Sequence, residues 1–116
     1  MDALKVIGTN IAHLRNALGL SQQQLAEYLE VNRVEVSYFE TGQRAVTNAK
    51  LTKLADLAGV ESTDLRSETF SRKRLEVKFA FRSDGFELSD LQTIAEFQRI
   101  ARTYIRYKLL LKAGDL

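Results

Sequence analysis

The side chains best suited to bind a ligand lie in one short stretch, residues 21–44. Ser21 and Gln24 form a capping-box pattern that predicts the start of a short helix, and Asn32 predicts the start of another. Val36 and Phe39 have the spacing of an inward face, so the opposite face of this second helix is expected to be exposed. The major groove of DNA admits one helix, whose first turn reaches base edges. The stretch therefore predicts a two-helix unit that reads DNA, with a plain helical hairpin as the alternative.

Other kinds of chemistry find little support in the 116 residues. There are no cysteines and one histidine, His13, so cysteine nucleophiles and metal sites built from Cys or His are not expected. The acidic residues are scattered over predicted helix surfaces, and there is no glycine-rich phosphate loop. We therefore expect no cofactor, no metal and no enzymatic activity.

Composition and charge fit a small soluble protein. Apolar residues make up 45% of the chain and charged residues 28%. No apolar run is long enough to span a membrane and no export signal is visible, so we expect a cytoplasmic protein without a membrane partner. Residues 1–66 carry 7 Lys/Arg and 8 Asp/Glu, and residues 67–116 carry 10 and 7. The resulting net charge of +2 permits a polyanionic partner without requiring one.

The first 66 residues have the pattern of a compact, mainly α unit of five short helices. Apolar residues at helical spacing predict helices over 3–18, 22–29, from Asn32 to Gly42, and over 48–58. Ser62 or Thr63 starts one further turn, which Leu65 anchors. Brief turns join these helices, so they are expected to pack as a bundle that forms the DNA-binding domain, residues 1–66.

The pattern changes after residue 66. Residues 67–74 are polar and include Arg72-Lys73-Arg74, which indicates a linker. Alternation over 75–82 predicts a strand with one apolar face, made of Leu75, Val77, Phe79 and Phe81. A long helix is expected over 89–112, and its apolar side comprises Leu91, Ile94, Phe97, Ala101, Tyr104 and Ile105. Another side carries Arg99, Arg102 and Arg106, for which a solvated face, a phosphate contact and an acidic partner all stay open.

A lone strand needs a partner, because its backbone amides and carbonyls must be paired. No second strand is evident in the sequence, so residues 75–116 are expected to form a dimerisation or partner-binding region. One option is a homodimer in which two strands form an antiparallel ribbon covered by the long helices. The other is addition of the strand to the sheet of a different protein.

Residues 7–65 resemble the Cro/cI-type, lambda-repressor-like (XRE) helix-turn-helix regulators. The stretches that carry the resemblance are Ile11-Ala12-His13-Leu14-Arg15, Leu18-Gly19-Leu20-Ser21-Gln22, Val36-Ser37-Tyr38-Phe39-Glu40-Thr41-Gly42 and Leu51-Thr52-Lys53-Leu54-Ala55. Several spaced elements agree over about half of the chain. The resemblance implies a sequence-specific regulator of transcription, a repressor that acts as a homodimer on palindromic operators in double-stranded DNA.

The resemblance also implies roles for individual residues. Gln22 matches a position that contacts the DNA backbone, and Arg44 is placed for a phosphate. The recognition-helix positions are Asn32, Arg33, Val34, Ser37 and Tyr38. Arg33 is the first choice for base readout because its guanidinium can bind guanine with two hydrogen bonds. Arg15 and Glu40 match a partly buried ion pair that ties the first helix to the third.

Two residues depart from the family pattern. Glu30 stands where glycine is common, and a left-handed backbone there would cost a non-glycine residue about 1–2 kcal/mol. Glu35 on the reading face would repel phosphate unless it accepts a hydrogen bond from cytosine. We therefore expect modest binding by one protomer, helped by dimerisation.

The tail also resembles that of XRE regulators encoded beside ImmA/IrrE-type metallopeptidases or acting as antitoxins. The residues concerned are Val77-Lys78-Phe79-Ala80-Phe81-Arg82 and Leu88-Ser89-Asp90-Leu91. This implies a second hypothesis, in which the chain is an antitoxin that binds and neutralises a toxin or metallopeptidase through its C-terminal strand and helix.

Overall fold

The computed structural model describes residues 2–70 and 88–112, and every element in them is helical. The elements are α1 (Ala3–Leu18), α2 (Gln22–Leu29), α3 (Arg33–Thr41), α4 (Asn48–Ala58), the 3₁₀ turn η1 (Ser62–Arg66) and α5 (Leu88–Lys112). The five helices and the turn expected from the sequence are confirmed to within one residue at each end. The expected strand over 75–82, with Leu75, Val77, Phe79 and Phe81, lies outside the described residues and stays a prediction.

Local capping explains where these helices begin and end. Ser21 Oγ accepts from the backbone amide of Gln24, whose side chain accepts in turn from the Ser21 amide. Glycine in the left-handed conformation ends α1, α3 and α4. Glu30 ends α2 in the same conformation, with φ 61°, and is the one non-glycine residue with positive φ in the described chain. Residue 30 therefore has the left-handed backbone conformation that favours glycine, although this chain carries glutamate there.

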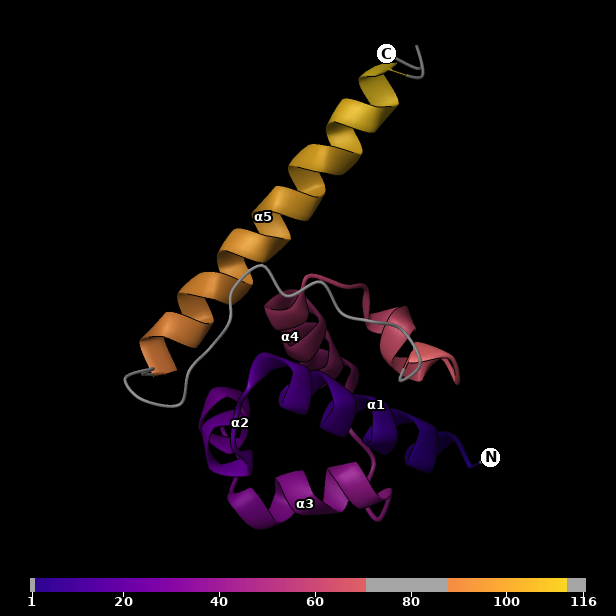
Figure 1. The fold of residues 1–116 in the computed structure, drawn as a ribbon, viewed down its shortest axis with the longest axis vertical. Coiled ribbons are helices and arrows are strands. Elements are labelled where there is room, and N and C mark those ends of the chain that lie inside the picture. The colour runs from indigo at the N-terminus through magenta and orange to yellow at the C-terminus, as the bar shows by residue number, and fades with distance from the viewer. Residues whose placement is uncertain (1, 71–87, 113–116) are drawn as a thin grey trace.

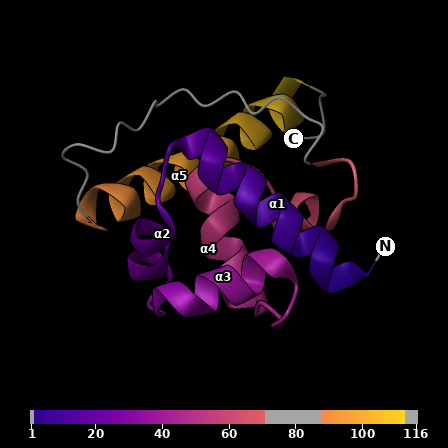
Figure 2. The same ribbon diagram turned by 60° about the horizontal axis from the view of Figure 1, so that its bottom comes forward.

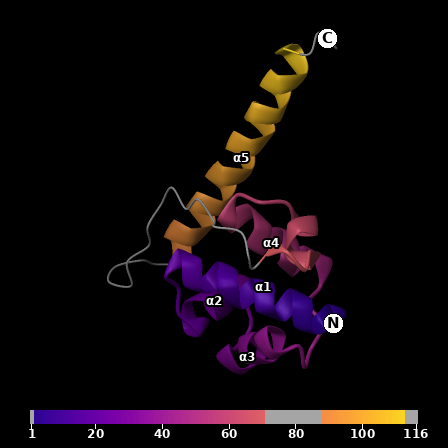
Figure 3. The same cartoon turned by 45° about the vertical axis from the view of Figure 1, so that its right-hand side comes forward.

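One apolar core joins all these helices. Ile11 and Leu14 of α1, Val36 of α3 and Leu54 of α4 have no exposed surface. α1 packs along α3, and α5 packs mainly on α4 and also contacts α2 (Figures 1 and 2). α3 consequently forms an outer edge of the bundle, on the side away from α5 (Figure 3).

The packed unit extends further along the chain than residue 66. Phe70 is 1% exposed and meets His13 edge to face, with ring centroids 5.8 Å apart. Buried Asn10 donates from Nδ2 to the carbonyl oxygens of Leu65 and Ser67, at 2.9 and 2.8 Å. The linker expected from residue 67 was therefore placed too early, because residues 67–70 belong to the bundle.

The start of α5 also belongs to the bundle. Leu91 and Ala95 are buried in the core, and Ile94 packs against it. Leu91 and Ile94 were expected on a dimerisation face, and the structure instead uses them within the chain. Ala101 is half-buried, Phe97 and Tyr104 are exposed, and the side chain of Ile105 lies outside the described residues.

Neither a membrane-spanning helix nor a metal site is found among the described residues. None of their helices has the length and apolarity to cross a membrane. They also contain no group of three or more His, Cys, Asp or Glu side chains arranged to hold a metal ion.

Candidate nucleic-acid interface

The two sides of α3 have different tasks. Val36 and Phe39 are 0% and 4% exposed and anchor the helix in the core. Asn32 Oδ1 accepts from the backbone amide of Glu35 at 2.8 Å and fixes the first turn. On the outer side Arg33 is exposed, and Val34 is 48% exposed. This half-buried, capped helix has the form needed to enter a groove, because its first turn is both rigid and accessible.

The structure gathers the predicted DNA-binding residues on one surface made by α2, α3 and the turn that follows. Asn32, Arg33, Val34 and Arg44 are exposed, whereas Gln22, Ser37 and Tyr38 are half-buried. We call these residues, together with Glu35, the α3 face. Their side chains are therefore available from solvent to different degrees, with Arg33 and Val34 the most accessible on the first turn.

Hydrogen bonds connect the starts of α2 and α3. Arg33 Nη1 donates to Gln22 Oε1 at 3.4 Å, and Gln22 Nε2 donates to Glu40 Oε1 at 3.1 Å. Gln22 is thus held by a residue of α3, at the amino-terminal end of α2. The two positions that the family pattern assigns to backbone contact and base contact are neighbours in the structure.

Arg44 is already engaged by an acidic residue of the α3 face. Its Nη1 lies 2.9 Å from Glu35 Oε1, and its guanidinium lies 5.2 Å from the centroid of the Tyr38 ring. The side chain of Arg44 is 51% exposed and that of Glu35 is 31% exposed, so water screens the pair and it is weak. A phosphate at this position would have to replace Glu35 as the partner of Arg44. The sequence indicated that Glu35 lies on the α3 face, but it did not predict the ion pair between Glu35 and Arg44.

Behind the α3 face, Arg15 and Glu40 form the ion pair implied by the family resemblance. Arg15 Nε lies 2.6 Å from Glu40 Oε2, and Nη2 lies 3.1 Å from Oε1. Arg15 Nη1 also donates to the carbonyl oxygen of Leu20 at 2.9 Å. The side chains are only 15% and 8% exposed. The pair thus holds α1, the turn after it and α3 in one arrangement.

Gly8 allows α1 and α3 to approach this closely. A Cβ atom at this position would lie 2.4 Å from the carbonyl oxygen of Phe39 and 2.6 Å from that of Glu40. These are backbone atoms that cannot move aside as a side chain could. The position of α3 relative to α1 therefore depends on the absence of a side chain at residue 8.

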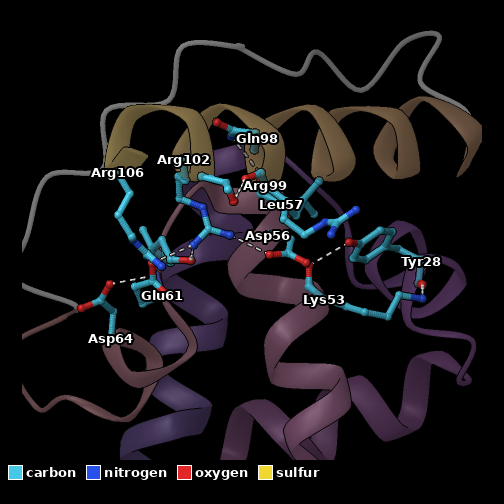
Figure 4. A network of polar contacts seen from close by, with 12 residues as sticks. Tyr28, Lys53, Asp56, Leu57, Glu61, Asp64, Gln98, Arg99, Arg102 and Arg106 are labelled. Atoms are coloured by element: carbon cyan, nitrogen blue, oxygen red, sulfur yellow. Dashed lines mark hydrogen bonds and ion pairs between the residues drawn. The ribbon is translucent and has the colours of Figure 1, made fainter. Parts of the chain in front are cut away.

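Arginine and glutamine of α5 bind the carboxyl end of α4 (Figure 4). Arg102 lies 2.6 Å from Asp56 and 3.2 Å from Glu61, and it donates to the carbonyl oxygen of Val60 at 2.7 Å. Gln98 Nε2 donates to the carbonyl oxygen of Leu57 at 3.1 Å. The positive charge of Arg102 is favourable beside the carboxyl end of α4, because the helix dipole is negative at that end.

We call these contacts the α4–α5 clamp, and they decide between the alternatives left open for the basic side of α5. Arg102 is half-buried in the clamp, and Arg106 pairs with Glu61 at 2.5 Å, while Arg99 is exposed. A fully solvated face is thus wrong for Arg102. The clamp was missed because its partners are 41 to 46 residues apart in the sequence, where no spacing rule applies.

A second link joins α2 to α4. Tyr28 Oη donates to the carbonyl oxygen of Lys53 at 2.7 Å, and Lys53 Nζ donates to the carbonyl oxygen of Tyr28 at 2.8 Å. Burial, and to a lesser degree the nearby carboxylate of Asp56, raise the pKa of the Tyr28 hydroxyl above its ordinary value of 10.0. Tyr28 is therefore held as a neutral donor within the core.

Comparison with known proteins agrees with the geometry. The helix-turn-helix family model matches residues 11–65, which run from α1 to η1. An uncharacterized HTH-type transcriptional regulator of Sinorhizobium fredii is 33% identical over 69 residues, which cover 60% of this chain and 90% of that protein. No solved structure gives a significant match. The capped helix pair and the exposed first turn of α3 agree with these matches. The chain belongs to the XRE-type helix-turn-helix regulators.

Proposed function

We propose that this chain is a sequence-specific regulator of transcription that binds double-stranded DNA through the α3 face. The observation that carries the proposal is the division of α3 into a buried anchor and an exposed first turn. Family membership supports it, and so does the similarity to the Sinorhizobium protein, which is described as a transcriptional regulator. The major groove is wide enough for one helix, which suits a helix at the outer edge of the bundle.

We assign individual contacts within this proposal as follows. Arg33 binds a guanine with two hydrogen bonds, and Val34 contacts a thymine methyl group. Gln22 and Arg44 bind phosphates and fix the orientation of α3, and Asn32, Ser37 and Tyr38 contact bases or backbone beside them. For Arg44 this requires exchange of Glu35 for a phosphate as its partner.

The proposed biological unit is a homodimer that represses transcription from a palindromic operator, in the cytoplasm. Two copies would present two α3 helices to half-sites about 34 Å apart, one turn of DNA. Dimerisation is needed because residues 1–66 have a net charge of −1, which gives little non-specific attraction to DNA.

The test is selection of bound sequences from random duplex DNA, followed by binding of the Arg33→Ala variant. We expect a palindrome, and loss of about 1–3 kcal/mol of discrimination at one base pair in each half-site. The matched control is Arg99→Ala, which removes an exposed arginine from α5, away from the α3 face. An Arg33→Ala variant that distinguishes operator from scrambled DNA as well as wild type does would overturn the assignment.

A second candidate function is neutralisation of a toxin or metallopeptidase by the C-terminal region. The observation in its favour is that α5 carries exposed large apolar side chains, Ile100 at 56% and Tyr104 at 58%. Co-expression with the neighbouring gene product, followed by size analysis, tests it. A chain that purifies without that protein, and with unchanged mass, contradicts this candidate.

A further inference from the structure

Glu35 lies at one edge of the exposed side of α3, and Arg33 lies at the opposite edge. Residues two positions apart on a helix point about 200° apart around its axis. Val34 lies between them in the sequence and is 48% exposed, which marks the outward side of the helix. At one edge Arg33 donates a hydrogen bond to Gln22, and at the other Glu35 forms an ion pair with Arg44. Glu35 therefore has a setting similar to that of Arg33, with the opposite charge.

Arg44 follows the end of α3 but reaches back to the first turn of that helix. Its Nη1 lies 2.9 Å from Glu35 Oε1, and its guanidinium lies 5.2 Å from the centroid of the Tyr38 ring. Glu35 and Tyr38 are three positions apart and therefore share one side of the helix. These two contacts keep Arg44 along the α3 face. A phosphate that binds Arg44 takes it from the Glu35 carboxylate, which then needs another partner.

The backbone at Glu35 does not depend on Arg44. Asn32 Oδ1 accepts a hydrogen bond from the Glu35 amide at 2.8 Å, and this cap fixes the first turn. The first turn is also the positive end of the helix dipole, which favours a carboxylate there. The side chain of Glu35 is 31% exposed even with Arg44 beside it. Departure of Arg44 therefore leaves a carboxylate on a rigid turn, accessible to a ligand on the α3 face.

The major groove offers this carboxylate few suitable partners, because an ionised carboxylate accepts hydrogen bonds and donates none. Guanine presents two acceptors there, thymine presents an acceptor and a methyl group, and adenine presents an amino donor beside an acceptor. Cytosine alone presents an amino donor, N4, with no acceptor on its own edge. A cytosine is therefore the base that the free carboxylate fits best.

We propose that Glu35 is a specificity-determining residue, which accepts a hydrogen bond from N4 of a cytosine once Arg44 has moved to a phosphate. The inference rests on the proposed function, since it concerns the binding of double-stranded DNA by the α3 face. At a site without that cytosine, the freed carboxylate faces acceptors and nearby phosphates, and both oppose binding. Glu35 thus lowers the affinity for wrong sequences more than it lowers the affinity for the operator.

The charge balance of the α3 face supports this role. Its charged residues are Arg33, Arg44 and Glu35, which give a net charge of +1. Without Glu35 the net charge would be +2 and attraction to any DNA would increase, because phosphate contacts carry no sequence information. An acid at this position therefore weakens binding that ignores sequence, and the cytosine contact restores binding where the sequence is correct.

Replacement of Glu35 by two different residues separates its charge from its contact. Glu35→Gln removes the charge and supplies an amide, which can pair with N6 and N7 of adenine. We expect it to change the preference at one base pair of each half-site from cytosine to adenine. Glu35→Ala removes both charge and contact and should leave no preference at that base pair. Both variants release Arg44, so both should bind more tightly to a duplex that lacks the cytosine in one half-site. That gain should exceed the gain on the operator by about tenfold.

Fluorescence anisotropy with the full chain tests the proposal. The duplexes are the operator selected from random DNA and a set in which each base pair of one half-site is replaced in turn. Wild type should lose about tenfold in affinity when the cytosine is replaced. The matched control Glu68→Gln, an exposed acid outside the α3 face, should show the same loss. Arg44→Met should keep the cytosine preference, weaken binding to every duplex and lower the slope of log affinity against log salt concentration by about 1.

Two results would overturn the assignment. One is a Glu35→Ala variant with the base preferences of wild type at every position. The other is an Arg44→Met variant with an unchanged salt slope, which would show that Arg44 does not move to a phosphate. Thermal unfolding of each variant checks that the bundle is intact. An operator whose recognition depends on Arg33 but not on Glu35 supports the proposed function and refutes this inference alone. Failure of every form to bind duplex DNA refutes both.

Discussion

Replacing Glu40 by leucine should destabilise the fold more than any exposed ion-pair change, because it leaves the Arg15 charge inside the protein. Glu40 Oε1 and Oε2 are the carboxylate partners of Arg15, whose side chain is 15% exposed. The hydrogen bond from Arg15 to the carbonyl oxygen of Leu20 would then remain. Breaking a buried pair from one side costs about 3–5 kcal/mol, and the partial exposure of Arg15 places this case near 3 kcal/mol.

The double replacement Arg15→Met with Glu40→Leu should cost less than Glu40→Leu alone. Both charges then leave together, so no ion is buried without a partner, and the new side chains fill a similar volume. A loss of about 3 kcal/mol lowers the Tm of a small domain by about 12 °C or more. The double variant should recover most of that difference.

Thermal and urea unfolding of wild type, both single variants and the double variant form a double-mutant cycle that measures the coupling. The control is Arg44→Met, which breaks the exposed pair with Glu35 and should cost less than about 1 kcal/mol. Additive losses in the cycle would show that Arg15 and Glu40 do not depend on each other. That result would refute the reasoning from burial.

Three further outcomes are expected. Glu30→Gly should raise the free energy of unfolding by up to about 1 kcal/mol, since the backbone at residue 30 is left-handed with φ 61°; urea unfolding measures this, and a loss of stability would contradict it. Tyr28→Phe should cost about 1 kcal/mol at pH 7 through the lost hydrogen bond. Because the folded pKa of Tyr28 is raised, its stabilisation is complete below its ordinary pKa of 10.0 and declines as the pH rises above it. The gap between wild type and Tyr28→Phe should therefore narrow at pH 11, and a constant gap would argue against a raised pKa. Glu35→Gln should tighten operator binding by roughly threefold to tenfold, as it removes an acid from the α3 face and releases Arg44 for phosphate; fluorescence anisotropy tests this against Glu68→Gln, an exposed acid outside that face.

The helices could be predicted from the sequence because the signals that define them are local. Ser21 with Gln24, and Gly59 after an apolar stripe, are separated from the helix ends they cap by at most three residues. The exposed position of Arg33 followed from the same reasoning, since Val36 and Phe39 settle which side of α3 faces inward.

The contacts that cross the molecule could not be predicted in this way. Phe70 stands alone in a polar stretch, so its burial beside His13 left no periodic signal. Leu91 belongs to an apolar pattern that a helix shows whether it packs against a partner or against the core of its own chain. The pairing of Arg102 with Asp56 depends on how α5 returns to α4, and spacing along the chain does not contain that information.

The contacts of α3 also bear on how such a protein can change its target. Gly8 and the Arg15–Glu40 pair hold the inner side of the helix by contacts that do not involve Arg33 or Val34. Substitutions at those two outward positions can therefore accumulate with little effect on folding. New DNA preferences can arise on an unchanged scaffold, one exposed side chain at a time.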